Sequence, residues 1–368
     1  MIRSLIAALC LVSALVATPV ASAADRFSPL EAALSKNVDV EFDVAIERDG
    51  KSLYRKKSYI VVCERLSSCP AYPSTRWRWA SVTKQIVAVL VLQEVAKGRI
   101  DLDAPLSRYL PRFKSANASL ITVRQLLRHQ TGLPNPDDTP AGAAGMASYY
   151  LPGFKSNRDP LGGYCSGPVK GTPGAGWTYN NCDYIVAGAL LKAVTGKSWD
   201  RLVKDRIARP LGLRSLIVLR SGKYEGANQF KLAGDIEPEL DFSAFGAAGS
   251  LAGSAEDLLA FDRALMNGKL LPPAQLAELW DGQAELGYIA LGQWVFTVPL
   301  KGCAAPVKIV ERRGAIGAVQ VRNFILPDQK VAAAVFVANP EFDFGEIWQG
   351  SGFSHDLLAL AACGTETK

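Results

Sequence analysis

Residues 81–96, with the sequence SVTKQIVAVLVLQEVA, predict a helix that is apolar on almost every side. Such a helix has to be buried, because none of its sides is suited to contact with water. Gly98 provides a C-terminal stop, since glycine readily adopts the left-handed conformation that ends many helices. We therefore expect a buried helix over residues 81–96.

Strand-like segments lie on both sides of this helix in the sequence. Two N-terminal strands are expected, at 39–48 and 53–63, and Asp49-Gly50 between them is typical of a hairpin turn. An amphipathic segment over residues 28–34 precedes them. The C-terminal part predicts four strands and a final helix, at 291–298, 307–312, 318–326, 331–338 and 354–362.

The middle of the chain predicts helices, at 123–129, 182–195, 199–207 and 255–266, with Pro/Gly-rich loops from 134 to 176. This order favours an α/β fold of the α+β type, in which an antiparallel sheet from both termini is flanked by helices and carries an inserted mostly helical lobe. We expect residues 24–80 plus 285–368 to form the sheet lobe. Residues 81–284 are expected to form the helical lobe, and the two together one domain.

The N-terminus is typical of a secretory signal peptide over residues 1–23. Arg3 precedes an apolar run from Leu5 to Val16, and Ala21-Ser22-Ala23 provides a small-residue cleavage site. No other stretch is long and apolar enough to span a bilayer. We therefore expect a periplasmic or secreted protein without a membrane anchor.

Six cysteines remain after the expected cleavage, an even number that favours disulfides in an oxidising compartment. Fifteen connectivities are possible. The pairing of sequence neighbours predicts Cys63 with Cys69, Cys165 with Cys182, and Cys303 with Cys363.

The composition favours neither nucleic acid nor a metal as a partner. The formal charge of +6 is spread thinly, and Arg76-Trp77-Arg78-Trp79 is too short for a binding surface. The chain has only two histidines, at positions 129 and 355, which do not form a metal-ligand cluster. We therefore expect no cofactor, no metal and no nucleic acid, and the oligomeric state is not predicted.

Ser81 and Lys84 form the only Ser-x-x-Lys of the chain. A serine hydroxyl becomes a good nucleophile when a neighbouring group removes its proton. The spacing of three places both side chains on one helix face, with Cβ atoms roughly 5 to 6 Å apart. His129 is interpreted as a structural cap after a helix and His355 as a surface or packing residue, so a Ser-His-Asp triad is the weaker alternative.

Tyr179 and Asn181 belong to the only Tyr-x-Asn of the chain, downstream of Ser81. Tyr179 is the second candidate proton carrier. We expect flanking cations, Lys84 and Arg312, to lower its pKa toward neutrality. The amide of Asn181 can hydrogen-bond both Lys84 and a substrate amide.

Arg312-Arg313-Gly314-Ala315 follows a predicted strand and provides a third candidate element. Gly314 allows a substrate backbone to approach closely. The backbone N–H groups of Ala315 and Ser81 can form an oxyanion hole. Arg312 is expected to supply a fixed cation for a substrate carboxylate.

These motifs resemble the serine β-lactamase and penicillin-recognising superfamily, in its class C β-lactamase, DD-peptidase and esterase branch. The resemblance covers nearly all of the chain after residue 23, including the segments 98–105, 121–129, 132–134, 173–174, 210–213 and 255–258. It implies one β-lactamase-like catalytic domain in which Ser81 is acylated, Lys84 and Tyr179 share proton transfer, and Asn181 orients the substrate. The family usually has Lys or His at position 312 and Thr or Ser at position 313, so Arg313 departs from the pattern.

The leading hypothesis is an exported serine hydrolase that forms an acyl-serine intermediate on an amide, an ester or a β-lactam. Because of Arg313, a peptidase or an esterase is favoured over a class C-like β-lactamase. A non-catalytic penicillin-binding or sensing protein of the same fold is the alternative from another class. The expected partner is a small-molecule or peptide substrate, with cell-wall material as one source.

Overall fold

The computed structural model describes residues 26–35, 41–58, 76–220, 231–232 and 235–363. The expected signal peptide lies outside these residues, as do both cysteines of the predicted Cys63–Cys69 pair.

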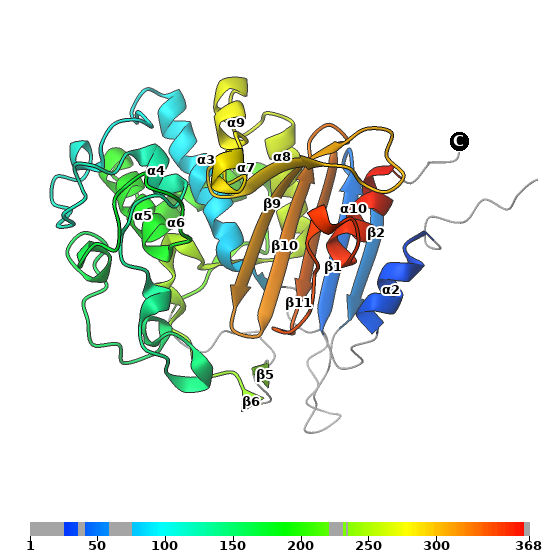
Figure 1. Cartoon of the computed structure of the whole chain (residues 1–368), viewed down its shortest axis with the longest axis horizontal. Coiled ribbons are helices and arrows are strands. Elements are labelled where there is room, and N and C mark those ends of the chain that lie inside the picture. Colours follow the sequence, from blue (N-terminus) through cyan, green and yellow to red (C-terminus); the bar gives the residue numbers. More distant parts are fainter. Residues whose placement is uncertain (1–25, 36–40, 59–75, 221–230, 233–234, 364–368) are drawn as a thin grey trace, which may run out of the picture.

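A six-stranded sheet in the order β2-β1-β11-β10-β9-β8 forms the framework, and all its neighbouring strands are antiparallel (Figure 1). The hydrogen-bonded neighbours β1 and β11 come from the N-terminal and C-terminal parts of the chain. The fold class expected from the sequence is therefore confirmed. The strands are β1 (Phe42–Arg48), β2 (Lys51–Ser58), β8 (Trp294–Val298), β9 (Val307–Ile316), β10 (Val319–Leu326) and β11 (Val331–Val337).

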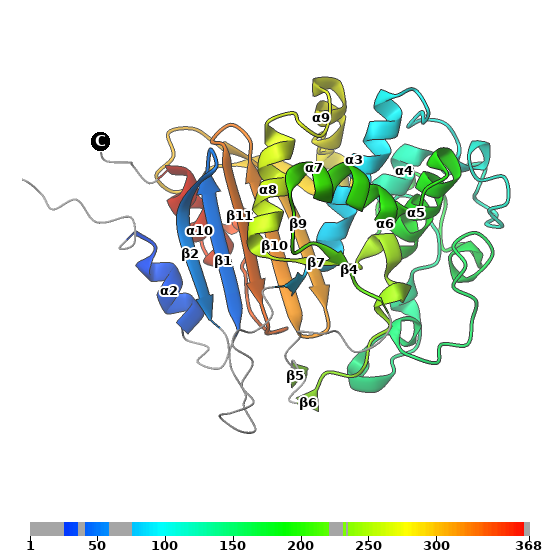
Figure 2. The same cartoon turned by 180° about the vertical axis from the view of Figure 1, so that it is seen from behind.

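Strand β11 shows why this sheet is covered on both faces. All its residues are buried, and successive side chains enter two different cores. Val335 packs with helices α2 (Ser28–Ser35) and α10 (Phe353–Cys363), which lie side by side on one face. Phe336 belongs to the core on the other face, where α8 (Ala255–Met266) packs on β1 and β11 (Figure 2).

Helix α3 (Thr83–Ala96) is the buried helix that the sequence predicts, and residues 83–92 are all buried. The other helices of this part include one that the sequence analysis missed, α9, which begins with Pro273 at its first turn. Helices α5, α6 and α9 contact α3 directly. The helices are α4 (Val123–Leu127), α5 (Asn181–Thr195), α6 (Trp199–Val203), α7 (Arg209–Leu211) and α9 (Pro273–Leu279), and a π-helical turn at Lys204–Ala208 joins α6 to α7.

Several predicted boundaries change in the structure. The long helix starts two residues late, because Ser81 lies on a 3-10 turn, η2 (Ala80–Val82). The strand predicted to end at 312 continues to Ile316, so Gly314 and Ala315 are part of β9. The shorter strands were not predicted; they are β3 (Trp77–Arg78), β4 (Ile217–Val218) and β7 (Leu251–Gly253) in one sheet, and β5 (Lys231–Leu232) and β6 (Asp235–Ile236) in another.

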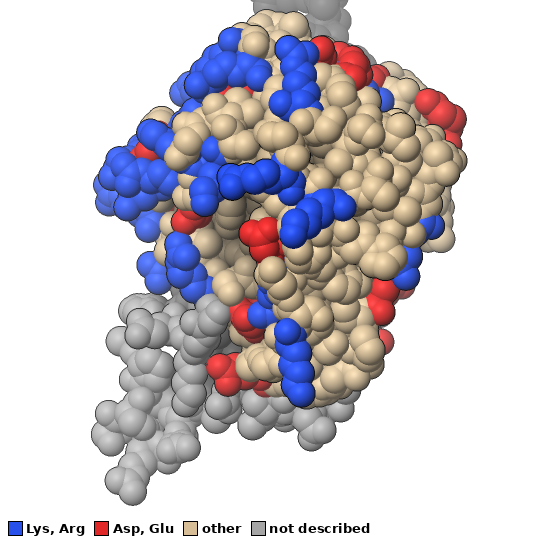
Figure 3. All heavy atoms as spheres, turned by 90° about the vertical axis from the view of Figure 1, so that its left-hand side faces the viewer, with Lys and Arg blue, Asp and Glu red and all other residues tan. Residues whose placement is uncertain are grey.

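Two predicted disulfides are confirmed. Cys165–Cys182 ties the Pro/Gly-rich loop to the first turn of α5, and Cys303–Cys363 ties the connection between β8 and β9 to α10. In the part of the chain that the structure describes, none of the helices has the length and apolar character needed to cross a membrane. On the face shown in Figure 3, Lys and Arg side chains gather toward the left, and the right-hand part is largely uncharged.

Candidate active site

Ser81 lies where the turn η2 meets strand β9. The preceding residue, Ala80, has a positive φ of 47°, a conformation that non-glycine residues rarely adopt and that often accompanies functional sites. The turn is held because the N–H of Trp79 donates to the carbonyl of Leu251 at 2.9 Å. This backbone geometry places the Ser81 hydroxyl at the surface of a cavity.

Lys84 is fully buried beside Ser81, and its amine Nζ has four partners. Two of them only accept hydrogen bonds: Asn181 Oδ1 at 2.7 Å and the Ala248 carbonyl at 2.8 Å. The other two are hydroxyls, Tyr179 OH at 2.6 Å and Ser81 Oγ at 2.9 Å. A neutral amine would use its two N–H groups on the acceptors and present its lone pair to the hydroxyls.

Tyr179 completes a cluster of three reactive groups. Its hydroxyl contacts both Lys84 Nζ and Ser81 Oγ, and it accepts a hydrogen bond from Arg312 Nη2 at 3.1 Å. The ring packs against the imidazole of His129, with 4.8 Å between ring centroids. The structure therefore brings together the serine, lysine and tyrosine that the sequence analysis singled out.

The protonation states differ from the expectation for Tyr179. Burial raises the pKa of Tyr179 above its ordinary value, and Arg312 offsets this only in part. Burial, followed by repulsion from Arg312, holds the pKa of Lys84 well below its usual range. The expectation of a tyrosine near neutrality was wrong, because the same burial that destabilises a phenolate also favours a neutral amine. Lys84 is thus the better candidate for the base.

Asn181 orients Lys84 and has its amide fully engaged. Its Oδ1 accepts from Lys84, and its Nδ2 donates to Tyr150 OH at 2.8 Å and to Asp137 at 3.1 and 3.2 Å. Both hydrogens of the amide are therefore used within the protein. The expected second role, a hydrogen bond to the substrate amide, would require Asn181 to give up one of these partners.

Asp137 is a site residue that the sequence analysis missed. Its carboxylate is exposed in the cavity, accepts from Tyr150 OH at 2.7 Å, and raises the pKa of Lys84. The neighbouring Asn135 fixes this loop to the Tyr-x-Asn segment through the Tyr179 carbonyl and the Asn181 N–H. The only sequence signal is Asn135-Pro136-Asp137, which indicates a turn and no chemistry.

Arg312 is fully buried, which corrects its expected role as a cation for a substrate carboxylate. Its Nε donates to the Ser81 carbonyl at 2.9 Å and its guanidinium lies over the rings of Tyr179 and Trp294, at 5.3 Å from each centroid. Arg312 therefore supports the Tyr179 hydroxyl and the turn that carries Ser81 from the side away from the cavity.

Gly314 and Ala315 lie on the part of β9 that extends beyond β8, whose pairing ends at Trp294 with Glu311. A Cβ atom at position 314 would lie 3.0 Å from both the Ser81 nitrogen and the Trp79 carbonyl oxygen, so only glycine allows this close approach. Ala315 is exposed in the cavity next to Ser81. This arrangement is compatible with the proposed oxyanion hole.

Arg313 points away from the reactive cluster and remains at the edge of the cavity. Its guanidinium forms ion pairs with Glu311 and Glu346, at 2.7 and 2.5 Å, and lies over the rings of Trp294 and Trp348. The long side chain therefore does not fill the space in front of Ser81. It also supplies none of the hydroxyl chemistry that the family usually has at this position.

The cavity in front of Ser81 has a volume of about 610 Å³. It is lined by both charged and apolar groups, and Lys84 and Arg312 lie behind its wall. The charged residues and polar side chains that line it are Ser81, Asp137, Tyr179, Asn181, Arg313, Gln320 and Arg322.

Neither histidine has a hydrogen bond to Ser81 in the described part of the chain. His129 is buried after α4, and its Nδ1 lies 3.0 Å from Asp183, which agrees with a structural role. His355 is buried in α10 beside Asp356. Among the described residues, no group of three or more His, Cys, Asp or Glu side chains is placed to hold a metal ion.

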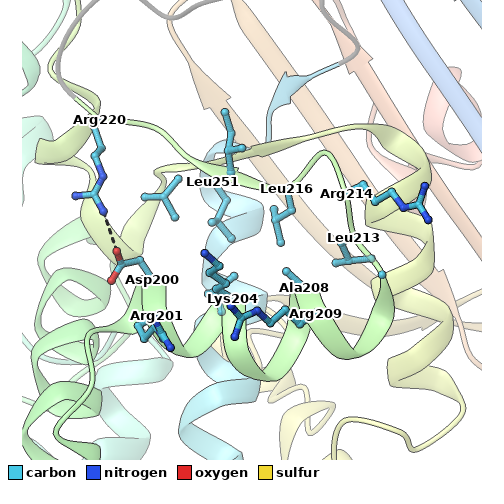
Figure 4. Close-up of a pocket in the computed structure, with 14 residues that line it drawn as sticks. Asp200, Arg201, Lys204, Ala208, Arg209, Leu213, Arg214, Leu216, Arg220 and Leu251 are labelled. Atoms are coloured by element: carbon cyan, nitrogen blue, oxygen red, sulfur yellow. Dashed lines mark hydrogen bonds and ion pairs between the residues drawn. The ribbon is translucent and has the colours of Figure 1, made fainter.

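Another hollow lies beside α6 and α7 and has none of the residues of the serine cluster (Figure 4). Exposed basic side chains such as Arg201, Lys204 and Arg209 project from the helices, and Arg220 pairs with Asp200 at 2.9 Å. Its base is formed by apolar side chains including Leu251. The chemistry of this hollow is unrelated to that of the cavity at Ser81.

The class of the protein follows from its fold and its site. It is a mixed α/β protein in which the Ser-x-x-Lys and Tyr-x-Asn motifs bring a serine hydroxyl, a lysine amine and a tyrosine hydroxyl into contact beside an antiparallel sheet. The family model described as Beta-lactamase matches residues 39–346. The chain belongs to this Beta-lactamase family.

Known proteins similar to the chain have different names within the family. Esterase EstB of Burkholderia gladioli is 33% identical over 221 residues, which cover 51% of this chain and 52% of the relative. The D-alanyl-D-alanine-carboxypeptidase/endopeptidase AmpH of Escherichia coli (strain K12) is 30% identical over 141 residues, covering 37% and 35%. The chain thus spans about half the length, or less, of these curated relatives. A D-stereospecific amidohydrolase from Streptomyces sp. has a similar structure, with a TM-score of 0.71, 26% identity, and coverage of 94% of this chain and 100% of that one.

Proposed function

We propose that this chain is an exported serine hydrolase of the peptidase or esterase type, which forms an acyl-serine intermediate on an amide or an ester. The observation that carries the proposal is the buried Lys84 amine, fixed by two acceptors and facing the hydroxyls of Ser81 and Tyr179. The relatives support this reaction class, since an esterase, a carboxypeptidase/endopeptidase and an amidohydrolase all cleave a bond to an acyl carbon.

In the acylation step, Ser81 Oγ attacks the carbonyl carbon of the substrate and its proton moves to neutral Lys84. The negative charge on the carbonyl oxygen is stabilised by the N–H groups of Ser81 and Ala315. The bond to the leaving group then breaks, and the ammonium of Lys84 returns the proton to the leaving atom through the Tyr179 hydroxyl. The product of this step is an ester between the acyl group and Ser81.

In the deacylation step, water attacks this ester in the same geometry. Lys84 accepts a proton from the water, directly or through Tyr179, and the tetrahedral intermediate again uses the two N–H groups. When the bond between the acyl carbon and Oγ breaks, the proton returns to Ser81. The cycle releases a carboxylic acid and restores the free enzyme.

Two observations make a β-lactam the less favoured substrate. Arg313 replaces the small hydroxyl residue usual in the family and is held by two glutamates at the cavity edge. Asn181, expected to contact a substrate amide, is bound to Asp137 and Tyr150, which favours an ester over a substrate that depends on this amide contact. A class C-like β-lactamase therefore remains the second candidate within the same chemistry.

Covalent labelling tests the proposal. The purified protein is incubated with a fluorophosphonate probe and with a fluorescent penicillin, and the adduct is located by mass spectrometry of peptides. We expect the fluorophosphonate to label the peptide that contains Ser81 and the Ser81→Ala variant to remain unlabelled. Equal labelling of the variant, or an unlabelled wild type, would favour the alternative of a non-catalytic binding or sensing protein.

The pH dependence of the reaction gives a prediction about Asp137. Lys84 has to be unprotonated to act as a base, so kcat/KM rises as the pH passes through its pKa, which lies below the ordinary value of 10.5. The negative charge of Asp137 stabilises the protonated amine and raises this pKa. The Asp137→Asn substitution should therefore shift the rising limb of the profile of kcat/KM to lower pH.

The control is Asp138→Asn, which removes the same charge from the adjacent exposed position. Asp138 is not among the groups that shift the pKa of Lys84. We expect its profile to coincide with that of the wild type. The assignment of Lys84 as the base would be contradicted if the rising limb of the pH profile moved to higher pH in Asp137→Asn. It would also be contradicted if the limb moved by the same amount in Asp137→Asn and Asp138→Asn.

A further inference from the structure

A second cavity, of about 550 Å³, adjoins the cavity at Ser81. The two share Trp294 and Arg313 in their linings. The second cavity differs in composition, because most of its lining is aromatic. The aromatic residues and the one charged residue that line it are Trp177, Tyr288, Trp294, Phe296, Trp348 and Arg313.

The aromatic rings of this pocket form a connected wall. Trp177 meets Trp294 edge to face at 6.1 Å between centroids, Phe296 meets Trp348 at 6.1 Å, and Tyr288 meets Phe296 at 6.3 Å. Arg313 connects the pair Trp177 and Trp294 to the other rings, since its guanidinium lies 5.7 Å from the Trp294 centroid and 5.6 Å from the Trp348 centroid. Such edge-to-face geometry fixes the orientation of the rings and leaves apolar surface for a ligand.

Two rings of this wall are exposed without a visible structural reason. Tyr288 is 48% and Trp348 is 59% exposed, and they are two of the four large hydrophobic side chains that are exposed in the described residues. Tyr288 also has a positive φ of 66°, which is costly for a bulky side chain. Exposed apolar surface gathered around a cavity is typical of a ligand-binding site.

The charges around the pocket are balanced. Arg313 pairs with Glu311 and Glu346, and Arg322 lies 3.8 Å from Glu311, so two cations face two anions. A substrate carboxylate would have to compete with these glutamates for Arg313. The pocket is therefore better suited to an uncharged group than to an anion.

The position of the pocket relates it to the leaving group. The proton donor for the leaving atom has to lie on the leaving-group side of the carbonyl carbon. In the proposed mechanism this donor is Tyr179, and the guanidinium of Arg312 lies over the rings of both Tyr179 and Trp294, of which Trp294 lines the pocket. Trp177, two residues before Tyr179, also lines the pocket. The acyl group, by contrast, remains beside Ser81 and Ala315.

We infer that this aromatic pocket is the leaving-group subsite and that it takes an uncharged aromatic group carried on the alcohol or amine of the substrate. This inference rests on the proposed acyl-serine mechanism and specifies its substrate class. The enzyme would thus prefer aryl-alkyl esters or amides to compounds that leave as a small alcohol or as a free amino-acid carboxylate.

The test uses acetate esters that differ only in the alcohol: methyl, benzyl, 2-phenylethyl and 3-phenylpropyl. Because these alcohols have similar acidity, differences in kcat/KM report binding rather than reactivity. We expect the best phenylalkyl ester to exceed the methyl ester by about tenfold or more. The same ester with a para carboxylate on its ring should lose most of this advantage.

The matched variants are Trp348→Ala and Leu120→Ala, since Leu120 is 60% exposed and does not line the pocket. Trp348→Ala should lower the ratio of kcat/KM for the phenylalkyl ester to that for the methyl ester by about tenfold, and Trp348→Phe should restore part of it. Leu120→Ala should leave kcat/KM for the phenylalkyl ester and for the methyl ester as in the wild type.

The outcomes separate this inference from the function on which it rests. If Ser81 is labelled by the fluorophosphonate but the ratio is unchanged in Trp348→Ala, the subsite is wrong and the hydrolase mechanism stands. The two acyl groups are compared with methyl phenylacetate and methyl acetate. If a phenyl group raises kcat/KM only when it is on the acyl side, the pocket binds the acyl group and not the leaving group. An absence of Ser81 labelling would overturn the mechanism itself.

Discussion

Ser81→Ala should lower kcat/KM for ester hydrolysis by at least about 10³-fold, because it removes the atom that forms the covalent intermediate. The hydroxyl lies in a crowded cluster, in contact with Tyr179 OH and 2.9 Å from Lys84 Nζ. Its removal leaves a small space and no unpaired charge, so the thermal midpoint of unfolding should be equal to that of the wild type or slightly higher.

Steady-state kinetics with a short-chain nitrophenyl ester and a thermal melt of the same samples check both parts of this prediction. A variant that keeps more than about a tenth of the activity would show that another nucleophile or a directly activated water does the chemistry. If the thermal melt shows that the variant is unfolded, its loss of activity is explained by unfolding and the prediction of an unchanged midpoint is wrong.

Lys84→Met should lower kcat by about 10³-fold, a typical loss when a positioned base is removed. Methionine is similar in size to lysine but lacks the amine, so Ser81 and Tyr179 would keep their places without a proton acceptor. The variant should also lose the rising limb of the pH profile, since the titrating group is gone. Measurement of kcat across the pH range tests this directly.

The double variant Ser81→Ala with Lys84→Met distinguishes a shared mechanism from two separate effects. Residues that act as a unit give losses that do not add, so the double variant should be about as inactive as Ser81→Ala alone. If the loss of activity in the double variant equals the product of the losses in the two single variants, Lys84 acts on a step that is independent of Ser81. A Lys84→Met protein with near-normal kcat would assign the base to Tyr179 instead.

The sequence predicted the framework well, because the framework depends on local patterns. The apolar run at 81–96 could only be a buried helix, and the strand-like segments at both ends of the chain were sufficient to predict one antiparallel sheet. The cluster of Ser81, Lys84 and Tyr179 was predicted from the spacing of the first pair and the uniqueness of the second motif.

The protonation states could not be predicted, because they depend on burial by distant segments. The chain around Tyr179 does not reveal that burial outweighs the cation of Arg312 and raises the pKa of the phenol. The role of Arg312 was misjudged for the same reason, since only the tertiary structure shows that it is fully buried.

The loop residues of the site were missed because their positions are set by tertiary contacts. Asp137 enters the cavity through hydrogen bonds with Tyr150 and Asn181, two residues that are distant in sequence. Trp177, Trp294 and Trp348 converge from three separate segments of the chain to form one pocket. No local sequence pattern or motif predicts that these side chains lie close together.

The most direct test of the central claim is rapid acid quenching during turnover of a slowly hydrolysed ester, followed by mass spectrometry of the protein. The account predicts a transient mass increase equal to the acyl group, located on the peptide that contains Ser81 and absent from Ser81→Ala. Turnover without any acylated protein, or an acyl group on a different residue, would contradict it.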